Sequence, residues 1–181
     1  LDYIIFDIQD IGSRYYTYIS TLTHILNAAS KANISVIVLD RPNPLGRKVF
    51  GPTISPEFYS FVGMHSIPVR HGMTIGELAL MINNENWLQS GKIVDLVIYK
   101  IENWDTNPGY FSIPPSPNIP DFTTALVYNG MCLLEGTNLS EGRGTKTPFL
   151  LFGAPWMNSK EVLEELINHH FSGVRFYQKT F

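Results

Sequence analysis

Two kinds of apolar pattern alternate in the first forty residues. Residues 3–6 ("YIIF") and 35–39 ("SVIVL") are short, continuous apolar runs, which is the pattern of strands that are buried on both faces. Between them, apolar residues from Tyr15 to Ala29 recur at helical spacing, Ser13 is placed to cap the helix, and Asn33 suits a left-handed end. Strand, helix and strand in this order predict a βαβ unit with parallel pairing and a right-handed crossover.

Further elements follow at wider spacing. The pattern predicts a helix from Thr74 to about Asn84, a strand over residues 94–99, a helix after Asp121 through about Leu133, a helix from Ser159, and a strand over residues 173–181. Thr74 and Glu77 form the sequence signature of a capping box. Residues 41–72 and 101–120 are rich in proline or glycine, so we expect long loops there, and loops of this length are usually functional.

Composition narrows the class of protein. The chain has 181 residues, 44% of them hydrophobic and 16% charged, with a net charge of −3, which is enough for a well-packed domain. The absence of basic runs favours neither nucleic acid nor a membrane surface as a partner. The single cysteine, Cys132, excludes an internal disulfide and a cysteine-rich metal site. No apolar run reaches the ~20 residues of a spanning helix. Because the chain opens without Met and inside a strand pattern, we expect a piece of a longer protein.

Charged residues follow the predicted strands at the edge where parallel sheets bind ligands. Asp7 ends the first strand and Asp40 the second, so the two carboxylates are candidates to hold sugar hydroxyls through charge-assisted hydrogen bonds. Asp10 and Arg14 follow closely. A structural interpretation stays open, in which Asp10 satisfies amide groups near the helix start and Asp7 pairs with Arg14.

Two short motifs carry further candidates. In "DRPNP", the prolines hold Arg41 and Asn43 in fixed directions, although a rigid turn alone would explain them. In "PVRHG", Arg70 and His71 precede a helix N-terminus, which suits an anion or a proton transfer. A structural histidine is the alternative. No spacing of ligands for a metal is present, so neither a metal nor a cofactor is expected.

The loop "LLEGTNLSEGRGT" is the richest in candidates. Glu135 and Glu141 are possible acids or sugar clamps, and Arg143 lies between two glycines that allow close approach of a ligand. The phosphate-loop and dinucleotide patterns are absent, and a simple surface loop remains the alternative. Some aromatic residues can stack on sugar rings, although most are expected in the core; they are Tyr15, Tyr16, Tyr18, Trp104, Tyr110, Phe111, Tyr128 and Trp156.

Six blocks in order carry a family resemblance: "DIQDIGSRYYTYI", "LDRPNPLG", "SFVGMHSIPVRHGMTIGELA", "PPSPNIP", "TALVYNGMCLLEGTNLSEGRGT" and "PFLLFGAPW". From about Asp2 to Trp156 the chain resembles the NamZ-like exo-β-N-acetylmuramidase family. The resemblance implies an α/β fold, with a Rossmann-like three-layer domain and a mostly parallel sheet over residues 1–157, and the start of a smaller C-terminal α/β subdomain over residues 158–181.

The resemblance also implies a glycoside hydrolase that removes N-acetylmuramic acid from the non-reducing end of peptidoglycan fragments. Glycoside hydrolysis commonly uses two carboxyl groups, and the candidates are Glu135 and Asp7, with His71 and Arg70 assisting. Arg70 or Arg143 is the candidate for the lactyl carboxylate of the sugar. The remaining substrate-binding candidates are Arg14, Asp40, Arg41, Asn43, Asn118, Asn138 and Glu141.

Three expectations follow for the whole protein. Family members carry an upstream block with glutamate, histidine and glycine, which is expected to supply a catalytic glutamate. Wall material as the substrate implies an extracytoplasmic location. A non-catalytic module that binds cell-wall sugar is the alternative function, and a nucleotide-binding α/β domain is disfavoured because the phosphate loop is missing.

Overall fold

The computed structural model describes residues 1–104, 106, 108–109, 111 and 113–180. The chain divides into two compact units, Leu1–Asn129 and Gly130–Phe181, and each is described by itself. This division falls earlier in the chain than the boundary expected after residue 157, which stays a prediction.

The regular elements follow one another in the expected order. They are β1 (Tyr3–Phe6), α1 (Tyr18–Ala32), β2 (Ser35–Leu39), the 3-10 helix η1 (Pro56–Phe58), α2 (Ile75–Asn84), β3 (Leu96–Tyr99), α3 (Phe122–Met131), the 3-10 helix η2 (Cys132–Gly136) and α4 (Ser159–Asn168).

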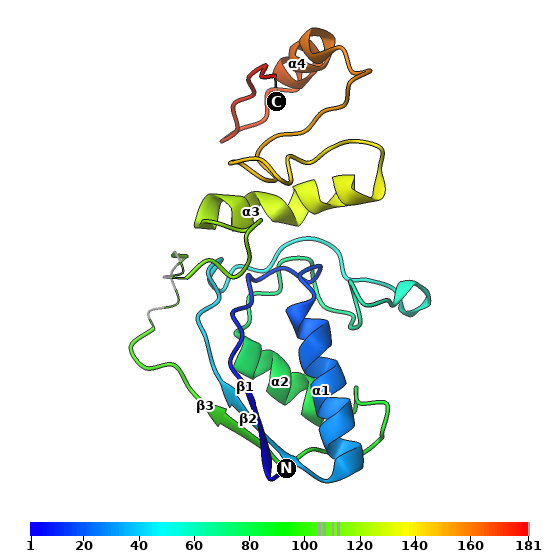
Figure 1. Cartoon of the computed structure of the whole chain (residues 1–181), viewed down its shortest axis with the longest axis vertical. Coiled ribbons are helices and arrows are strands. Elements are labelled where there is room, and N and C mark those ends of the chain that lie inside the picture. Colours follow the sequence, from blue (N-terminus) through cyan, green and yellow to red (C-terminus); the bar gives the residue numbers. More distant parts are fainter. Residues whose placement is uncertain (105, 107, 110, 112, 181) are drawn as a thin grey trace. The chain divides into compact units, whose positions relative to one another are not determined.

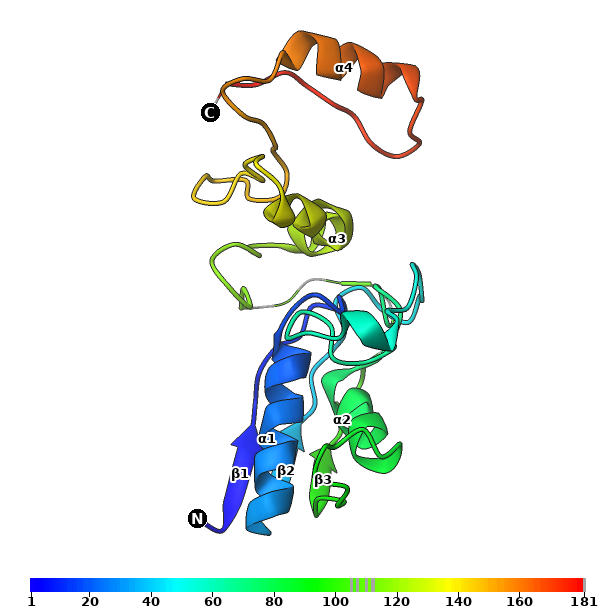
Figure 2. The same ribbon diagram turned by 90° about the vertical axis from the view of Figure 1, so that its right-hand side faces the viewer.

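The first unit is built on a three-stranded parallel sheet in the order β1-β2-β3 (Figures 1 and 2). Tyr3 pairs with Ser35, and Val36 pairs with Leu96. Parallel neighbours need crossover connections, and α1 and α2 lie in these two connections. The predicted βαβ unit and the α/β class are therefore confirmed.

Both helices pack on the same face of the sheet. Phe6, Val36 and Val38 are each at most 1% exposed and share one core cluster with the apolar residues of α1 and α2. The opposite face carries the alternate residues of the strands, among them Tyr3 at 58%, Ile5 at 63% and Tyr99 at 61% exposure. The prediction that β1 is buried on both faces is wrong, and the described residues form two of the three expected layers.

Helix α1 begins later than the sequence pattern predicts. Its N-cap is Thr17, not Ser13, because Ser13 forms an isolated antiparallel bridge with Arg70 and Gly12 turns the preceding backbone at φ +80°. Residues 10–16 are thereby held in a loop. The end of the helix is as expected, since Asn33 takes the left-handed conformation.

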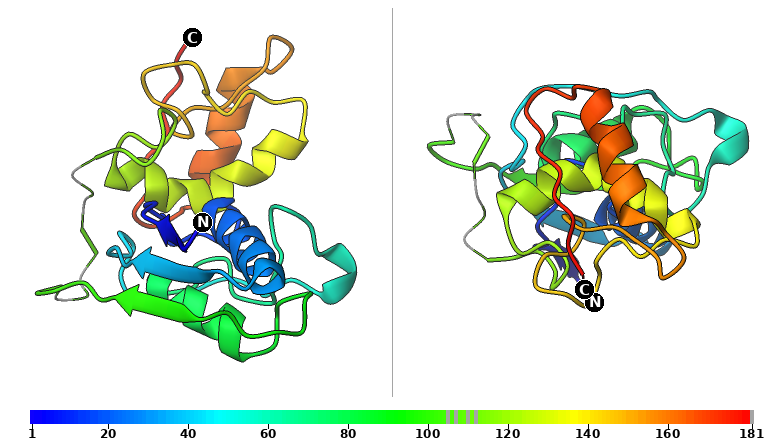
Figure 3. Two further views of the ribbon diagram at one scale, coloured as in Figure 1. Left: turned by 60° about the horizontal axis from the view of Figure 1, so that its bottom comes forward. Right: turned by 90° about the horizontal axis from the view of Figure 1, so that it is seen from above.

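The predicted loop over residues 41–72 is confirmed and is tied to the rest of the unit by arginines. The Arg14 guanidinium donates through Nη1 to the carbonyl oxygens of Pro52 (2.8 Å) and Ile67 (2.6 Å). Arg70 donates to the carbonyl of Leu45. Around η1 the loop extends away from the sheet and helices (Figure 3). The arginines thus replace the regular hydrogen bonds that this proline-rich segment lacks.

The second unit contains the end of α3, η2 and α4. Helix α4 begins at Ser159, as predicted, and the side chain of Asn158 caps it by accepting hydrogen bonds from the first turn. The strand predicted over residues 173–181 is wrong for residues 173–180, which form no regular element, and Phe181 lies outside the described residues. A strand needs a partner for its hydrogen bonds, and none of the described residues of this unit provides one.

Candidate functional site

An ion pair lies at the carboxyl ends of β1 and β2. The Nε and Nη2 atoms of Arg41 contact the same oxygen of Asp7, Oδ1, at 2.7 and 2.5 Å. The two side chains are 37% and 46% exposed. Asp7 directly follows β1 and Arg41 follows β2, so parallel pairing of the strands brings them together. Asp7 therefore pairs with Arg41, and the alternative pairing with Arg14 is wrong.

This pair forms part of a cavity of about 220 Å³. The cavity is lined by Asp7, Ile8, Gln9, Tyr18, Arg41, Phe111, Ile113, Pro114 and Pro115. The lining thus combines charged side chains with apolar ones, which suits a sugar ring with an apolar face and polar substituents. Tyr18 and Phe111 are among the predicted stacking aromatics; Tyr110 lies outside the described residues.

Asp40 binds the N-terminus of α2. One carboxylate oxygen accepts from the backbone N–H of Gly76 (2.7 Å) and of Arg41 (3.0 Å), and the other accepts from the hydroxyl of Thr74 (2.9 Å). Gly76 permits this approach, because a Cβ there would lie 2.7 Å from Cγ of Asp40. Both oxygens of Asp40 are thus occupied by the protein itself.

Asp10 and His71 form a buried pair. The Nε2 atom of His71 lies 3.2 Å from Oδ2 of Asp10, and the ring nitrogen Nδ1 accepts from the backbone N–H of Met73 at 3.2 Å. Since Nδ1 accepts, we assign the proton of the neutral ring to Nε2. The His71 side chain is 0% exposed. In this state both ring nitrogens have internal partners, which favours the structural alternative for His71.

Asn43, Arg14 and Arg70 also contact backbone groups. Asn43 is 2% exposed; its amide donates to the carbonyl of Met73 (2.9 Å) and its oxygen accepts from Leu45 (2.9 Å). Burial lowers the pKa of the Arg70 guanidinium. Asn118 is half-buried between Ser116 and Ile119, which form an isolated bridge.

The candidates of the second unit form their own cluster. Arg143 donates through Nη2 to Glu135 (2.5 Å) and through Nε to Glu141 (3.0 Å). Although burial opposes it, Glu135 and Glu141 raise the pKa of Arg143. Gly142 has φ +79°, a conformation that favours glycine. Asn138 is exposed in the same loop. The structure thus brings Glu135, Glu141 and Arg143, three candidates of one loop, together through the Arg143 side chain.

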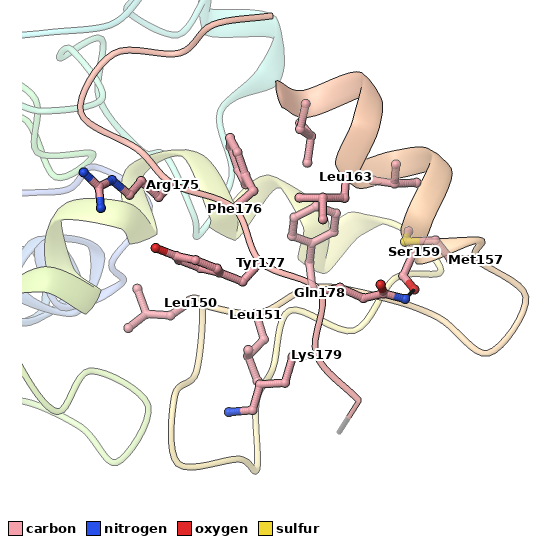
Figure 4. Close-up of a pocket in the computed structure, with 13 residues that line it drawn as sticks. Leu150, Leu151, Met157, Ser159, Leu163, Arg175, Phe176, Tyr177, Gln178 and Lys179 are labelled. Atoms are coloured by element: carbon pink, nitrogen blue, oxygen red, sulfur yellow. Dashed lines mark hydrogen bonds between the residues drawn. The ribbon is translucent and has the colours of Figure 1, made fainter. Parts of the chain in front are cut away.

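A second cavity of about 240 Å³ lies wholly within the second unit, between α4 and residues 150–152 and 175–179. Leu163, Phe176 and Tyr177 form part of its wall (Figure 4). None of the candidates predicted from the sequence lines this cavity.

Within the described parts of the chain, no three or more His, Cys, Asp or Glu side chains gather as they would around a metal ion. Among the same residues, no helix combines the length and the apolar character needed to cross a membrane.

Comparison with known proteins supplies the context of this site. Residues 1–123 match the sequence model of the family described as "Exo-beta-N-acetylmuramidase NamZ, N-terminal", and residues 126–181 match "Exo-beta-N-acetylmuramidase NamZ, C-terminal". The chain belongs to the NamZ family. The predicted resemblance is confirmed, and the two matched regions meet close to the division between the two compact units.

Relatives of this chain include a named muramidase and two proteins of known crystal structure. The peptidoglycan beta-N-acetylmuramidase NamZ of Bacillus subtilis (strain 168) is 44% identical over 187 aligned residues, which take in 100% of this chain and 44% of the relative. Two DUF1343 family proteins from Bacteroides fragilis are 43% and 38% identical, with TM-scores of 0.80 and 0.82. They match 85% and 95% of this chain, and 44% and 46% of theirs. The chain thus spans less than half the length of these relatives.

Sequence reasoning missed part of the cavity wall. Gln9 donates to the carbonyls of Asp10 (2.6 Å) and Pro42 (2.8 Å) and so joins the two strand-end loops. Ile113, Pro114 and Pro115 form an apolar side. The proline-rich composition of residues 101–120 indicated a functional loop, but nothing in it indicated which strand end the loop would approach.

Proposed function

We propose that this chain forms part of a glycosidase that releases N-acetylmuramic acid from the non-reducing end of peptidoglycan fragments. The observation that carries the proposal is the 44% identity, over the whole of this chain, to a peptidoglycan beta-N-acetylmuramidase. The cavity at the strand ends supports it, because it combines an ion pair with an apolar wall. A muropeptide or another saccharide with terminal muramic acid is the proposed substrate.

Asp7, which lines this cavity, is the proposed catalytic carboxylate of the first unit. Arg41 binds Oδ1 of Asp7, and no hydrogen bond from a described residue occupies Oδ2, so we propose that Oδ2 meets a sugar hydroxyl or the anomeric centre. Glycosidases commonly pair such a carboxylate with a second carboxyl group. Glu135 remains the proposed second group in this chain, and a glutamate from the upstream block of the family is the other proposal. His71 is proposed to act by holding Asp10 and the strand-end loop.

A substrate of this kind also suggests where the protein works. Peptidoglycan lies outside the cytoplasmic membrane, so we propose a periplasmic or secreted location. A reporter fusion to the natural gene, assayed by fractionation of the cells, tests this point independently of the activity.

The test of the activity is release of a chromogenic leaving group from a β-N-acetylmuraminide. We expect release by the chain extended to the length of its relatives, and at least a tenfold loss, of the order of one catalytic group, in Asp7→Asn. The thermal unfolding midpoint of Asp7→Asn should stay close to that of the unaltered protein, because an exposed ion pair adds little stability.

Glu57→Gln is the matched control, since Glu57 is exposed and lies in η1 within the extended loop. Saturable binding of the sugar without release would favour the non-catalytic cell-wall module. Equal losses of activity and stability in Asp7→Asn would assign Asp7 a structural role, and no release by any form would contradict the glycosidase proposal.

A further inference from the structure

The arginines of the first unit differ in how much of each guanidinium remains available. Arg14 is 6% exposed and Arg70 is half-buried, and the hydrogen bonds of both side chains go to backbone carbonyls. Arg47 pairs with Glu77 and lies 4.8 Å from the ring centre of Trp104. Arg41 alone among these four lines the strand-end cavity.

The ion pair with Asp7 uses one edge of Arg41. A guanidinium has two edges that can each bind a carboxylate, one formed by Nε and one terminal nitrogen and the other by both terminal nitrogens. Asp7 contacts Nε and Nη2. Within the described residues, no hydrogen bond or ion pair occupies Nη1 of Arg41. The terminal edge, formed by Nη1 and Nη2, is therefore open to a second carboxylate.

We infer that Arg41 selects the ligand by binding its carboxylate through this terminal edge, while Asp7 holds the guanidinium in position. The inference rests on the proposed function and names its specificity residue. N-acetylmuramic acid differs from N-acetylglucosamine by a lactyl ether that ends in a carboxylate, so a single guanidinium can distinguish the two sugars. Other residues that line the cavity, such as Ile113 and Pro114, carry no charge with which to bind this carboxylate.

Charge favours Arg41 over the arginine of the second unit for this role. Arg143 already contacts two carboxylates, those of Glu135 and Glu141. The cluster of these three side chains has a net negative charge, which would repel a third carboxylate. Arg41 contacts the single carboxylate of Asp7. The earlier expectation that Arg70 or Arg143 binds the lactyl group is thus replaced by a proposal for Arg41.

The test compares the two sugars in Arg41 variants. Isothermal titration with N-acetylmuramic acid and N-acetylglucosamine is carried out on this chain and on the chain extended to the length of its relatives. In Arg41→Gln we expect about a 10- to 100-fold loss of affinity for N-acetylmuramic acid, the value of hydrogen bonds to a charged group. Affinity for N-acetylglucosamine should change less than about threefold, because that sugar makes no contact with the charge.

Two further variants sharpen the result. Arg41→Lys keeps the charge but loses the planar fork, so it should retain part of the preference for N-acetylmuramic acid. Arg47→Gln is the matched control, since Arg47 is also exposed and paired with one acid but lies outside the cavity lining; it should keep the full preference. Thermal unfolding of each variant checks that it is folded.

The outcomes separate the two proposals. Equal losses for both sugars in Arg41→Gln, or an unchanged preference for N-acetylmuramic acid, would overturn the role of Arg41 and leave the glycosidase proposal intact if the extended protein still releases sugar. Failure of both unaltered proteins to bind N-acetylmuramic acid would also overturn the role of Arg41, whereas the glycosidase proposal is overturned only if the extended protein releases no sugar.

Discussion

The two aspartates that follow β1 and β2, Asp7 and Asp40, have different surroundings. Asp7 and Asp40 both follow a strand, but Asp40 is held by three hydrogen bonds from the start of α2 and from Arg41 N–H. In contrast, no described residue makes a hydrogen bond to Oδ2 of Asp7. A carboxylate whose hydrogen bonds are all internal stabilises the fold. One that lines a cavity is available to a ligand, and this difference favours Asp7 over Asp40 in the proposed site.

His65, the histidine whose pKa is shifted most, lies outside the candidate site. His65 is 6% exposed, stacks on Trp87 with ring centres 4.7 Å apart, and contacts the Thr23 hydroxyl at 2.8 Å. The Thr23 hydroxyl donates to the carbonyl of Ile19, so it accepts from Nε2 of a neutral His65 ring. Burial lowers the pKa of His65 from 6.5 to about 4, because the charged ring loses its hydration.

This pKa predicts that stability falls in mild acid. Between about pH 6.5 and 4 the unfolded chain binds a proton at His65 that the folded chain does not, so the free energy of unfolding decreases as the pH falls and levels off below pH 4. The expected total is about 2 to 3 kcal/mol. Urea unfolding of the chain at a series of pH values measures it.

His65→Gln is the comparison for this prediction. Glutamine does not titrate and still has an amide to donate to Thr23, so the variant should lose this part of the pH dependence and keep that of the other groups. An identical decrease in both proteins would show that His65 does not cause it.

At the scale of elements, the N-terminus of α2 links the sheet to the helix. Thr74 and Glu77 form the predicted capping box, with bonds of 3.2 Å from Glu77 N–H to the Thr74 hydroxyl and 2.9 Å from Thr74 N–H to Glu77. Asp40 adds its charge to the same end of the helix, where the helix dipole favours an anion. The end of β2 is thereby fixed against the start of α2.

We predict that Asp40→Asn lowers the free energy of unfolding by about 1 to 3 kcal/mol, through loss of a charge and an acceptor at the helix N-terminus. Thr74→Ala, made alone and together with Asp40→Asn, gives a double-mutant cycle in urea unfolding. The coupling should be non-zero because the two side chains share a hydrogen bond of 2.9 Å. Unchanged stability with loss of sugar binding would instead support the original assignment of Asp40 as a substrate ligand.

At the scale of the whole molecule, the first unit has an apolar sheet face that its own helices do not cover. Tyr3, Ile5, Val97 and Tyr99 are between 42% and 63% exposed on this face. Parallel sheets are normally covered on both faces, and large exposed apolar patches are sites of association.

We predict that this 181-residue chain binds a hydrophobic dye such as ANS and self-associates at micromolar concentration. Replacing Ile5 and Tyr99 by lysine should reduce both effects with little loss of stability, because these side chains are already exposed. Size-exclusion chromatography with light scattering measures the association. Val49→Lys, at a residue that is 57% exposed outside the sheet, is the control, and a monomer that binds no dye would contradict the prediction.

The sequence by itself determined the local elements and the family. Apolar periodicity placed β1, α1, β2 and α2 to within a few residues, since spacing along the chain follows the geometry of each element. Capping at Thr74 and the left-handed end at Asn33 depend on neighbouring residues, so they were also predicted. The six motif blocks indicated the family that the comparisons confirmed.

The tertiary structure alone decided which charges meet. That Asp7 pairs with Arg41, that Asp40 caps α2, and that His71 lies against Asp10 depend on contacts between residues 34 to 61 positions apart. The late start of α1 has the same cause, since the bridge from Ser13 to Arg70 competes with local capping. Which face of the sheet the helices cover is likewise fixed by how the chain crosses over. A sequence pattern records what each residue prefers, whereas the partner that satisfies a polar group is chosen only when distant segments pack together.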